Sequence, residues 1–347
     1  MQPILEQNCI LLPEEKTRLV QNTINRDVFS KQGVAYFLGS LPVTMSRRNL
    51  QSQVHNRQQR YLATPKADGE RYFLIVGGSR ELMLFSRSRQ IWMIRNARAP
   101  EGVQYSVFDG ELVLCKGSSA AARRKSPRAL KFLCCDALQW NSRSLIEEPL
   151  LARLGIAASF CESYAEAPES STNNALWRIE FKPYYDVFSS RVFMAQQLER
   201  LDYEVDGFVF ASGNTAYIPG TDSSMFKWKP LISMNTVDFL VEYNAITNET
   251  LFSVRCGDRQ PLGGLRASSN RQTSVKYKCP GNALLEQLQL SESCIVECEP
   301  LSDGENLAWR LLKVRHDKRI PNFEGVYDDA CRAVQEKIGF REIFPLE

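Results

Sequence analysis

The sequence predicts an α+β protein, with a large mixed domain of antiparallel sheets and helices, then a small β-barrel and a C-terminal helix. Three observations lead to this prediction. The 347 residues suit two domains better than one. Between Arg60 and Val209, short apolar runs are separated by polar loops and a few segments with helical periodicity. After Pro230, apolar runs recur at a spacing of roughly 10 residues.

The first domain is expected over residues 1–232. A helix is predicted over Pro13–Arg26, because an acidic start precedes apolar residues at helical spacing. Runs such as "RYFLIV", "ELMLFSR", "GELVLC" and "GFVFA" predict strands. Two further helices are predicted over Ser144–Leu154 and Ser189–Leu201.

The second domain is expected over residues 233–322. Its runs "TVDFLVEYNAI", "TLFSVR", "SVKYKC" and "SCIVECEPL" fit the short strands of an OB-fold barrel. Residues 323–347 form the closing segment, with a helix over Gly325–Ile338 that we expect to pack back on the first domain.

Composition excludes several classes of protein. The net charge of +3 is too small to indicate a partner. The ten cysteines show no disulfide spacing, and we expect neither a secretory leader nor a membrane span, so a reducing compartment is predicted. With two histidines, a histidine dyad is not expected, and Cys294 and Cys298 lack the second pair of a zinc site.

Lys66 is the first candidate for chemistry, within "YLATPKADGERYFLIV". A lysine must lose its proton before it acts as a nucleophile, and desolvation and nearby cations such as Arg71 favour that loss. Taken alone, the stretch is more typical of a hairpin turn with a surface lysine than of a nucleophile.

"FKWKP" supplies two more cations. Alternate residues of a strand share a face, so Lys227 and Lys229 would point one way and Phe226 and Trp228 the other. Two cations on one face fit a phosphate-binding wall, although such a pattern is also common on edge strands.

Two acidic segments accompany these lysines. Asp109 and Glu111 in "VFDGELV", and Glu204 and Asp206 in "YEVDGFVF", would each share one face of a strand. Carboxylates near phosphate-binding lysines suggest a hydrated Mg²⁺ or Mn²⁺, although each Asp-Gly pair is also typical of an ordinary turn.

A basic cluster lies near the end of the second domain, in "WRLLKVRHDKRIPN". Lys313, Arg315, Lys318 and Arg319 surround Asp317. Such a run is commonly a solvated face. If the second domain swings over the first, the same cluster could deliver cations to phosphates.

In this order, the segments resemble the covalent nucleotidyltransferase superfamily of mRNA capping enzymes and ATP-dependent ligases. "KADG" resembles its motif I, "FDGELV" motif III, "FLCCDAL" motif IIIa, "EVDGFVF" motif IV and "FKWKP" motif V. The lead-in "FLGSLPVTMSRRNL", the form "KADGERY" and the ending "WRLLKVRHDKRIPN" resemble the RNA guanylyltransferase of eukaryotic and viral capping enzymes in particular.

The resemblance implies a reaction and a set of residues. The enzyme would transfer GMP from GTP, through a lysyl-GMP intermediate on Lys66, to the 5′-diphosphate end of RNA, forming a GpppN cap. Lys227 and Lys229 would contact the α-phosphate, and Glu111 and Asp206 would place Mg²⁺ or Mn²⁺. The remaining GTP-binding residues implied are Arg71, Arg87, Glu111, Lys182, Arg315, Asp317 and Lys318.

The sequence departs from the family at the base-binding segment. Cys135 stands where an aromatic residue often precedes the aspartate of motif IIIa, and Phe132 is a candidate substitute for stacking on the base.

Two alternatives to guanylyltransferase remain open: an ATP-dependent polynucleotide ligase, and an inactive relative that binds nucleotide or capped RNA.

The resemblance also implies partners and a location. The expected partners are RNA and the phosphorylated tail of RNA polymerase, with no membrane involved. A separate RNA triphosphatase is expected because the sequence has no H-C-x5-R phosphatase loop. The enzyme would act in the nucleus, or in the cytoplasm if it is viral.

Overall fold

The structure is a computed structural model that describes residues 1–31, 37–116, 130–166, 178–230, 234–244, 249–255, 270–271, 294–303, 306–316 and 318–346. The chain divides into two compact units. Unit 1 comprises Met1–Val43, Ser52–Lys227 and Phe344–Glu347, and unit 2 comprises Thr44–Gln51 and Trp228–Ile343. No helix of the described residues is long and apolar enough to cross a membrane.

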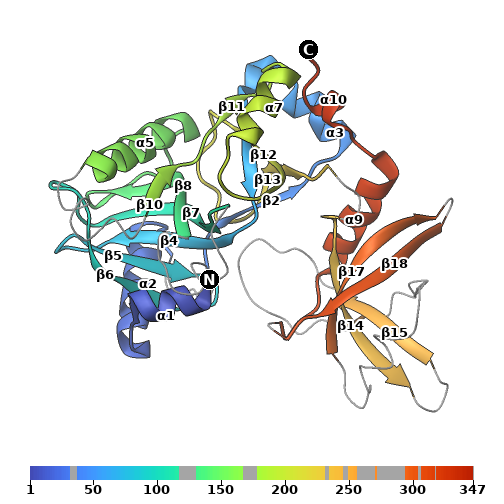
Figure 1. The fold of residues 1–347 in the computed structure, drawn as a ribbon, viewed down its shortest axis with the longest axis horizontal. Coiled ribbons are helices and arrows are strands. Elements are labelled where there is room, and N and C mark those ends of the chain that lie inside the picture. The colour runs from blue at the N-terminus through green and yellow to red at the C-terminus, as the bar shows by residue number, and fades with distance from the viewer. Residues whose placement is uncertain are drawn as a thin grey trace. The chain divides into compact units, whose positions relative to one another are not determined.

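Unit 1 contains two sheets (Figure 1). The large sheet has the order β1-β6-β5-β4-β7-β8-β10, and β9 pairs with β8. Its strands are β1 (Cys9–Leu11), β4 (Glu70–Val76), β5 (Glu81–Ser86), β6 (Ile91–Arg98), β7 (Ser106–Leu114), β8 (Leu130–Trp140), β9 (Arg143–Ser144) and β10 (Arg178–Phe181).

The second sheet of unit 1 has the order β11-β3-β12-β13-β2. Its strands are β2 (Ser40–Thr44), β3 (Tyr61–Ala67), β11 (Tyr185–Asp186), β12 (Val205–Ser212) and β13 (Gly220–Trp228). A π-helical turn, Leu50–Val54, and a 3₁₀ turn, Arg57–Gln59, precede β3.

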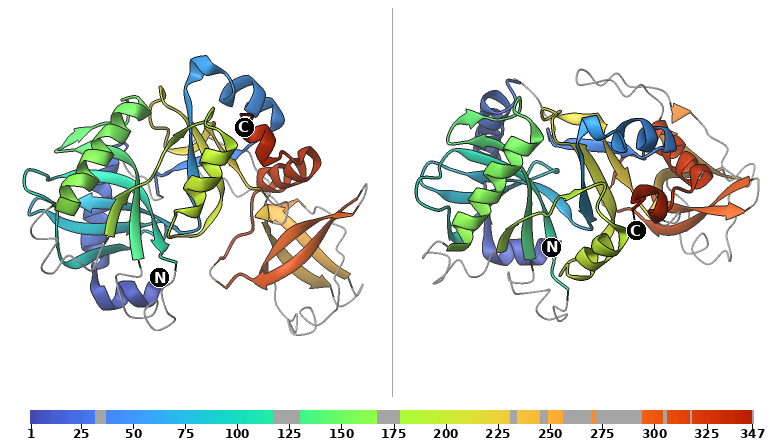
Figure 2. Two further views of the ribbon diagram at one scale, coloured as in Figure 1. Left: turned by 45° about the horizontal axis from the view of Figure 1, so that its top comes forward. Right: turned by 90° about the horizontal axis from the view of Figure 1, so that it is seen from above.

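Helices cover both faces of the large sheet, which is why β4 and β5 read as unbroken apolar runs. Helices α1 (Gln2–Asn8) and α5 (Leu150–Glu166) share one core with Leu74 and Leu84, and both views of Figure 2 show α5 lying along the sheet. On the other face, α2 (Glu14–Asp27) packs near Phe73.

The predicted helices agree with the structure to within two residues at each end, except the helix expected over 144–154, which differs at both ends. Helix α2 matches the prediction closely, and α7 spans Arg191–Glu199. The helix expected over 144–154 instead begins at Leu150, because Ser144 pairs with Gln139 in a β8–β9 hairpin. It continues to Glu166 since Ala157, Phe160, Cys161 and Tyr164 repeat at helical spacing toward the core.

Unit 2 contains an antiparallel sheet of order β16-β15-β14-β17-β18. Its strands are β14 (Val237–Asn244), β15 (Glu249–Arg255), β16 (Asn270–Arg271), β17 (Cys294–Asp303) and β18 (Asn306–Val314). Among these described strands no pairing closes the sheet, so the OB barrel stays a prediction, whereas the mixed α+β class is confirmed.

The C-terminal segment divides between the two units. Helix α9 (Glu324–Glu336) packs within unit 2, where Tyr327 and Ala330 join the core around Phe239 and Trp309. Short helices α3 (Arg47–Asn49) and α10 (Phe340–Ile343) also belong to unit 2. Contacts of this segment with residues 1–232, where packing is expected, include Trp228 Nε1 donating to the Ile338 carbonyl, Arg47 pairing with Glu342, and the Phe344 ring against the rings of Phe208 and Phe210.

Candidate active site

Lys66 lies inside a strand rather than at the tip of a hairpin. Strand β3 belongs to the second sheet and β4 to the large sheet, so the chain crosses between sheets at Asp68 and Gly69. The backbone amide of Asp68 donates to the carbonyl of Glu204, which ties this crossing to the start of β12. The hairpin with a surface lysine is therefore excluded, and Lys66 is the second-last residue of β3.

Gly69 allows the crossing to lie directly against β7. A Cβ atom at Gly69 would stand 2.5 Å from the carbonyl oxygen of Leu112 and 2.8 Å from both Glu111 Cγ and Val113 Cγ1. No side chain fits at such distances, so glycine is required by close approach. The "KADG" and "FDGELV" segments are thereby brought together.

The amino group of Lys66 pairs with Asp206. Lys66 Nζ lies 2.8 Å from Asp206 Oδ1 and 3.0 Å from Oδ2, and the two side chains are 25% and 20% exposed. Asp206 falls in a β-bulge, because Ala67 pairs with Val205 and Pro65 with Phe208. A bulge re-aims side chains locally. The sequence predicted cations around Lys66, whereas its observed partner is a carboxylate.

Arg71 is fixed by a buried acid. Its Nε and Nη2 atoms donate to the two carboxylate oxygens of Asp109, which is fully buried. The hydroxyl of Tyr217 donates to Asp109 Oδ2 at 2.5 Å. Burial lowers the pKa of Arg71, but the charge and hydrogen bonds of Asp109 outweigh it and raise that pKa above its usual range.

Glu111, Lys182 and Arg87 surround Arg71. Glu111 is the cross-strand partner of Arg71, and its Oε2 lies 4.0 Å from Nζ of Lys182, a side chain only 5% exposed. Partial burial and then the charge of Arg71 lower the pKa of Arg87, and Glu111 opposes this. These four predicted GTP-binding residues therefore lie in one cluster.

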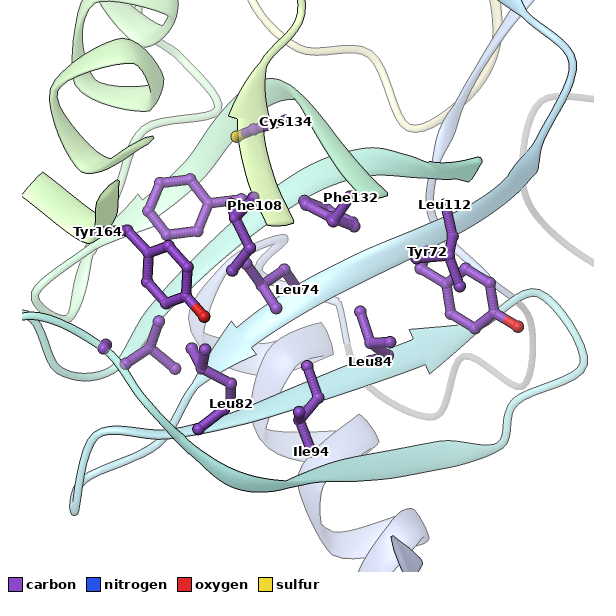
Figure 3. Packing of buried hydrophobic residues seen from close by; sticks show 14 of the residues in the cluster. Tyr72, Leu74, Leu82, Leu84, Ile94, Phe108, Leu112, Phe132, Cys134 and Tyr164 are labelled. Atoms are coloured by element: carbon purple, nitrogen blue, oxygen red, sulfur yellow. The ribbon is translucent and has the colours of Figure 1, made fainter. Parts of the chain in front are cut away.

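Cys135 borders the same cluster. Burial raises the pKa of its thiol to about 11, while the charges of Lys182 and Arg71 act in the opposite direction. The suggestion that Phe132 stacks on the base is wrong: it is 1% exposed and part of the core beneath the sheet (Figure 3). A Cβ atom at Gly110 would stand 2.3 Å from its ring, so Phe132 fills the space that this glycine leaves.

The two lysines of "FKWKP" follow the predicted alternation. Phe226 and Trp228 are buried, whereas Lys227 and Lys229 are partly exposed. Lys227 lies on β13, the neighbour of β12 in the sheet that holds Lys66. Lys229 follows the end of the strand, and its Nζ donates to the carbonyl of Met234 at 2.9 Å.

The metal prediction concerns Glu111 and Asp206, which are 18% and 20% exposed. No group of three or more histidine, cysteine or acidic side chains in the described residues is arranged to hold a metal ion. Mg²⁺ is commonly held by one or two carboxylates together with water and substrate phosphates. Each of these two partly exposed carboxylates is of the kind Mg²⁺ takes, but each is paired with a lysine here, so a shared metal site stays a prediction.

The predicted cations of the second domain belong to unit 2. Arg315 Nη1 lies 3.0 Å from Asp238 Oδ1, and Lys318 pairs with the other oxygen of that carboxylate. Asp238 is 4% exposed, so these pairs satisfy a buried charge. Asp317 lies outside the described residues.

Two contributors to the site were missed from the sequence. Asp109 was expected only to share a face with Glu111, yet it holds Arg71. Tyr217 lies 108 positions from Asp109 along the chain, in a loop between β12 and β13 without a motif. The sequence indicates that Asp109 needs a partner, because a buried acid must be paired or hydrogen-bonded. Nothing in the sequence around Tyr217 indicates that its hydroxyl is one of those partners.

Comparison with known proteins identifies the family. Residues 6–231 match the model for the mRNA capping enzyme catalytic domain, and residues 234–344 match the mRNA capping enzyme C-terminal domain. The chain belongs to the mRNA capping enzyme family. Membership confirms the predicted resemblance and the predicted type of enzyme, an mRNA guanylyltransferase.

Relatives with this name span most of the chain. The mRNA-capping enzyme subunit alpha of Schizosaccharomyces pombe is 25% identical and covers 96% of this chain and 85% of its own length. The Yarrowia lipolytica subunit alpha is 28% identical and covers 87% of this chain and 80% of its own length. The mRNA-capping enzyme of Danio rerio is 24% identical over 89% of this chain and 49% of its own length.

The solved structures that resemble this capping-enzyme chain include ligases. A mycobacterial DNA ligase D complexed with ATP and MES has a TM-score of 0.45 and 15% identity, covering 81% of this chain and 95% of its own. The ATP-dependent DNA ligase from bacteriophage T7 has a TM-score of 0.41 and 14% identity, with 80% and 98% coverage.

Proposed function

We propose that this chain transfers GMP from GTP to the 5′-diphosphate end of RNA through a covalent lysyl-GMP intermediate on Lys66. Family membership supports the reaction type. The observation that carries the assignment of the nucleophile is the contact between Lys66 Nζ and Asp206 at 2.8 Å, at the crossing between two sheets.

In the first step, Lys66 Nζ forms a bond to the α-phosphorus of GTP. The bond between the α-phosphorus and the oxygen that bridges it to the β-phosphate breaks, and pyrophosphate is released. The ammonium group must lose a proton before it attacks. Asp206 is within hydrogen-bond reach of that proton and can accept it, or orient Nζ while water does so.

The cluster around Arg71 would bind the nucleotide. Arg71 and Glu111 are proposed to hold the ribose, with Arg87 near the ribose and phosphates. Lys182 would contact the base or the phosphates. Phosphoryl transfer depends mainly on positioning and on neutralising phosphate charge, which fixed cations supply without reorganisation.

Lys227 and Lys229 are proposed to contact the α-phosphate. Mg²⁺ or Mn²⁺ would be held by Glu111 and Asp206 and would supply charge neutralisation at the phosphates. Arg315, Asp317 and Lys318 are proposed, on resemblance alone, to orient the leaving pyrophosphate.

In the second step, an oxygen of the terminal phosphate of RNA attacks the phosphorus of lysyl-GMP. The phosphorus–nitrogen bond breaks, Lys66 is regenerated and the GpppN cap is complete. We propose as partners a separate RNA triphosphatase, which would generate the 5′-diphosphate end, and the phosphorylated tail of RNA polymerase. The proposed location is the nucleus, or the cytoplasm for a viral enzyme.

The proposal is tested by incubating the chain with α-labelled GTP or ATP and a divalent cation. We expect labelling by GTP that resists alkali and is lost in acid, as for a phosphoramidate. Lys66→Ala should abolish labelling, whereas Lys16→Ala, at an exposed lysine on α2, should not. Labelling by ATP alone would indicate a ligase, and no labelling by either would indicate an inactive binding relative.

A further inference from the structure

Tyr217 donates a hydrogen bond whose direction is fixed by its surroundings. Its hydroxyl accepts the backbone N–H of Ser40 at 2.8 Å and lies 2.5 Å from Asp109 Oδ2. An amide can only donate, so the single hydroxyl proton is directed at the carboxylate. Ser40 and Tyr217 are 1% and 6% exposed, so water does not readily replace either partner.

The ring of Tyr217 is also held in place. It contacts the ring of Phe29 at a centroid distance of 6.1 Å, and the guanidinium of Arg153 lies 5.7 Å from its centroid. Arg153 is in turn fixed by two hydrogen bonds of 2.9 Å to Asp136. The hydroxyl therefore has little freedom to leave Asp109.

Asp109 transmits this constraint to Arg71. Its carboxylate receives Nε and Nη2 of Arg71 on one side and the Tyr217 hydroxyl on the other. A bidentate pair sets the plane of the guanidinium. Within the described part of the chain, Arg71 Nη1 makes no hydrogen bond, and the side chain is 25% exposed.

We propose that Tyr217 is a positioning residue for GTP binding, which acts through Asp109 on the orientation of Arg71. This inference rests on the proposed function, because it assumes that Arg71 contacts GTP. A contact of Arg71 with the ribose would be made equally in the ground state and the transition state. Its loss therefore raises KM and leaves kcat nearly unchanged.

The test is the rate of enzyme–GMP formation against GTP concentration in Tyr217→Phe. We expect KM for GTP to rise about tenfold, the loss typical of one hydrogen bond to a charged group, with kcat within about threefold. Tyr164→Phe is the matched control, because Tyr164 is 3% exposed and its hydroxyl has no hydrogen-bond partner in the described structure. It should leave KM unchanged.

A double-mutant cycle separates positioning from a general loss of structure. In an Asp109→Asn background, Tyr217→Phe should change KM by less than about twofold. A KM in the double variant that equals the product of the two single fold-changes would overturn the inference. If Tyr217→Phe fails to fold, Asp109→Asn alone should reproduce the rise in KM, and an unchanged KM there would overturn it.

The outcomes also distinguish this inference from the proposed function. If the unaltered chain is not labelled by GTP, both fail. If the unaltered chain is labelled and KM in folded Tyr217→Phe is the same as in the unaltered chain, only the role of Tyr217 fails.

Discussion

The crossing at Gly69 gives a prediction that links stability to activity. In Gly69→Ala, the new methyl group would meet the Leu112 carbonyl oxygen at 2.5 Å, about 1 Å inside normal contact. That oxygen belongs to β7, a strand inside the large sheet that is not free to move, so the backbone at Asp68 and Gly69 must shift away from it. Overpacking of this kind costs about 1–3 kcal/mol. For a unit of this size, 2 kcal/mol corresponds to a fall in melting temperature of about 4–8 °C.

Gly155→Ala is the matched control. Gly155 lies inside α5, and a Cβ atom there meets nothing within 4 Å. Alanine in a helix interior is favoured over glycine by about 0.5–1 kcal/mol, so this variant should melt slightly higher.

Both variants would be compared by thermal unfolding and by labelling with GTP. Because the crossing carries Lys66 and packs against Glu111, we expect Gly69→Ala to lose at least about tenfold in the labelling rate, while Gly155→Ala keeps it. An unchanged melting temperature and labelling rate in Gly69→Ala would show that close approach to β7 does not require glycine at this position.

Two further predictions concern titration. Burial raises the pKa of Glu297, but hydrogen bonds from Thr236 and Lys313 and nearby cations outweigh it, so the net shift is downward from 4.5. A lowered folded pKa contributes stability above pH 4.5 that is lost as the pH falls through the folded value. Glu297→Gln should therefore lower the melting temperature at pH 7, with the difference shrinking below pH 4; a difference that grows in acid would contradict this. Because burial raises the pKa of Cys135 to about 11, less than about 0.1% is thiolate at pH 7.5. Alkylation of Cys135 by iodoacetamide, followed by peptide mass spectrometry, should accelerate roughly tenfold per pH unit up to pH 9.5, and fast alkylation independent of pH would disprove the assignment.

The order of the segments along the chain carried most of the functional prediction. Local patterns sufficed for the alternation of Phe226 and Trp228 with Lys227 and Lys229, because burial has period two in a strand. They did not suffice for Lys66, since a lysine before Asp-Gly reads the same in a hairpin as at a crossing between sheets.

The contacts that hold the site were harder to predict. Asp109 and Tyr217 lie 108 positions apart and meet only because the two sheets of unit 1 pack together. An aspartate does not predict a tyrosine as its partner, so this pair could not be predicted from the sequence. Phe132 was a reasonable candidate for stacking by residue type, but its strand turns it into the core against Gly110. Helix α5 begins at Leu150 rather than at Ser144, because Ser144 pairs with Gln139 in the β8–β9 hairpin although its residue type also suits the start of a helix.

Mass spectrometry of the chain after incubation with GTP and Mg²⁺ tests directly whether Lys66 is the nucleophile. We predict one GMP adduct, located on the peptide that contains Lys66 and discharged when RNA with a 5′-diphosphate end is added. An unmodified chain, or an adduct on any other residue, would contradict a lysyl-GMP intermediate on Lys66.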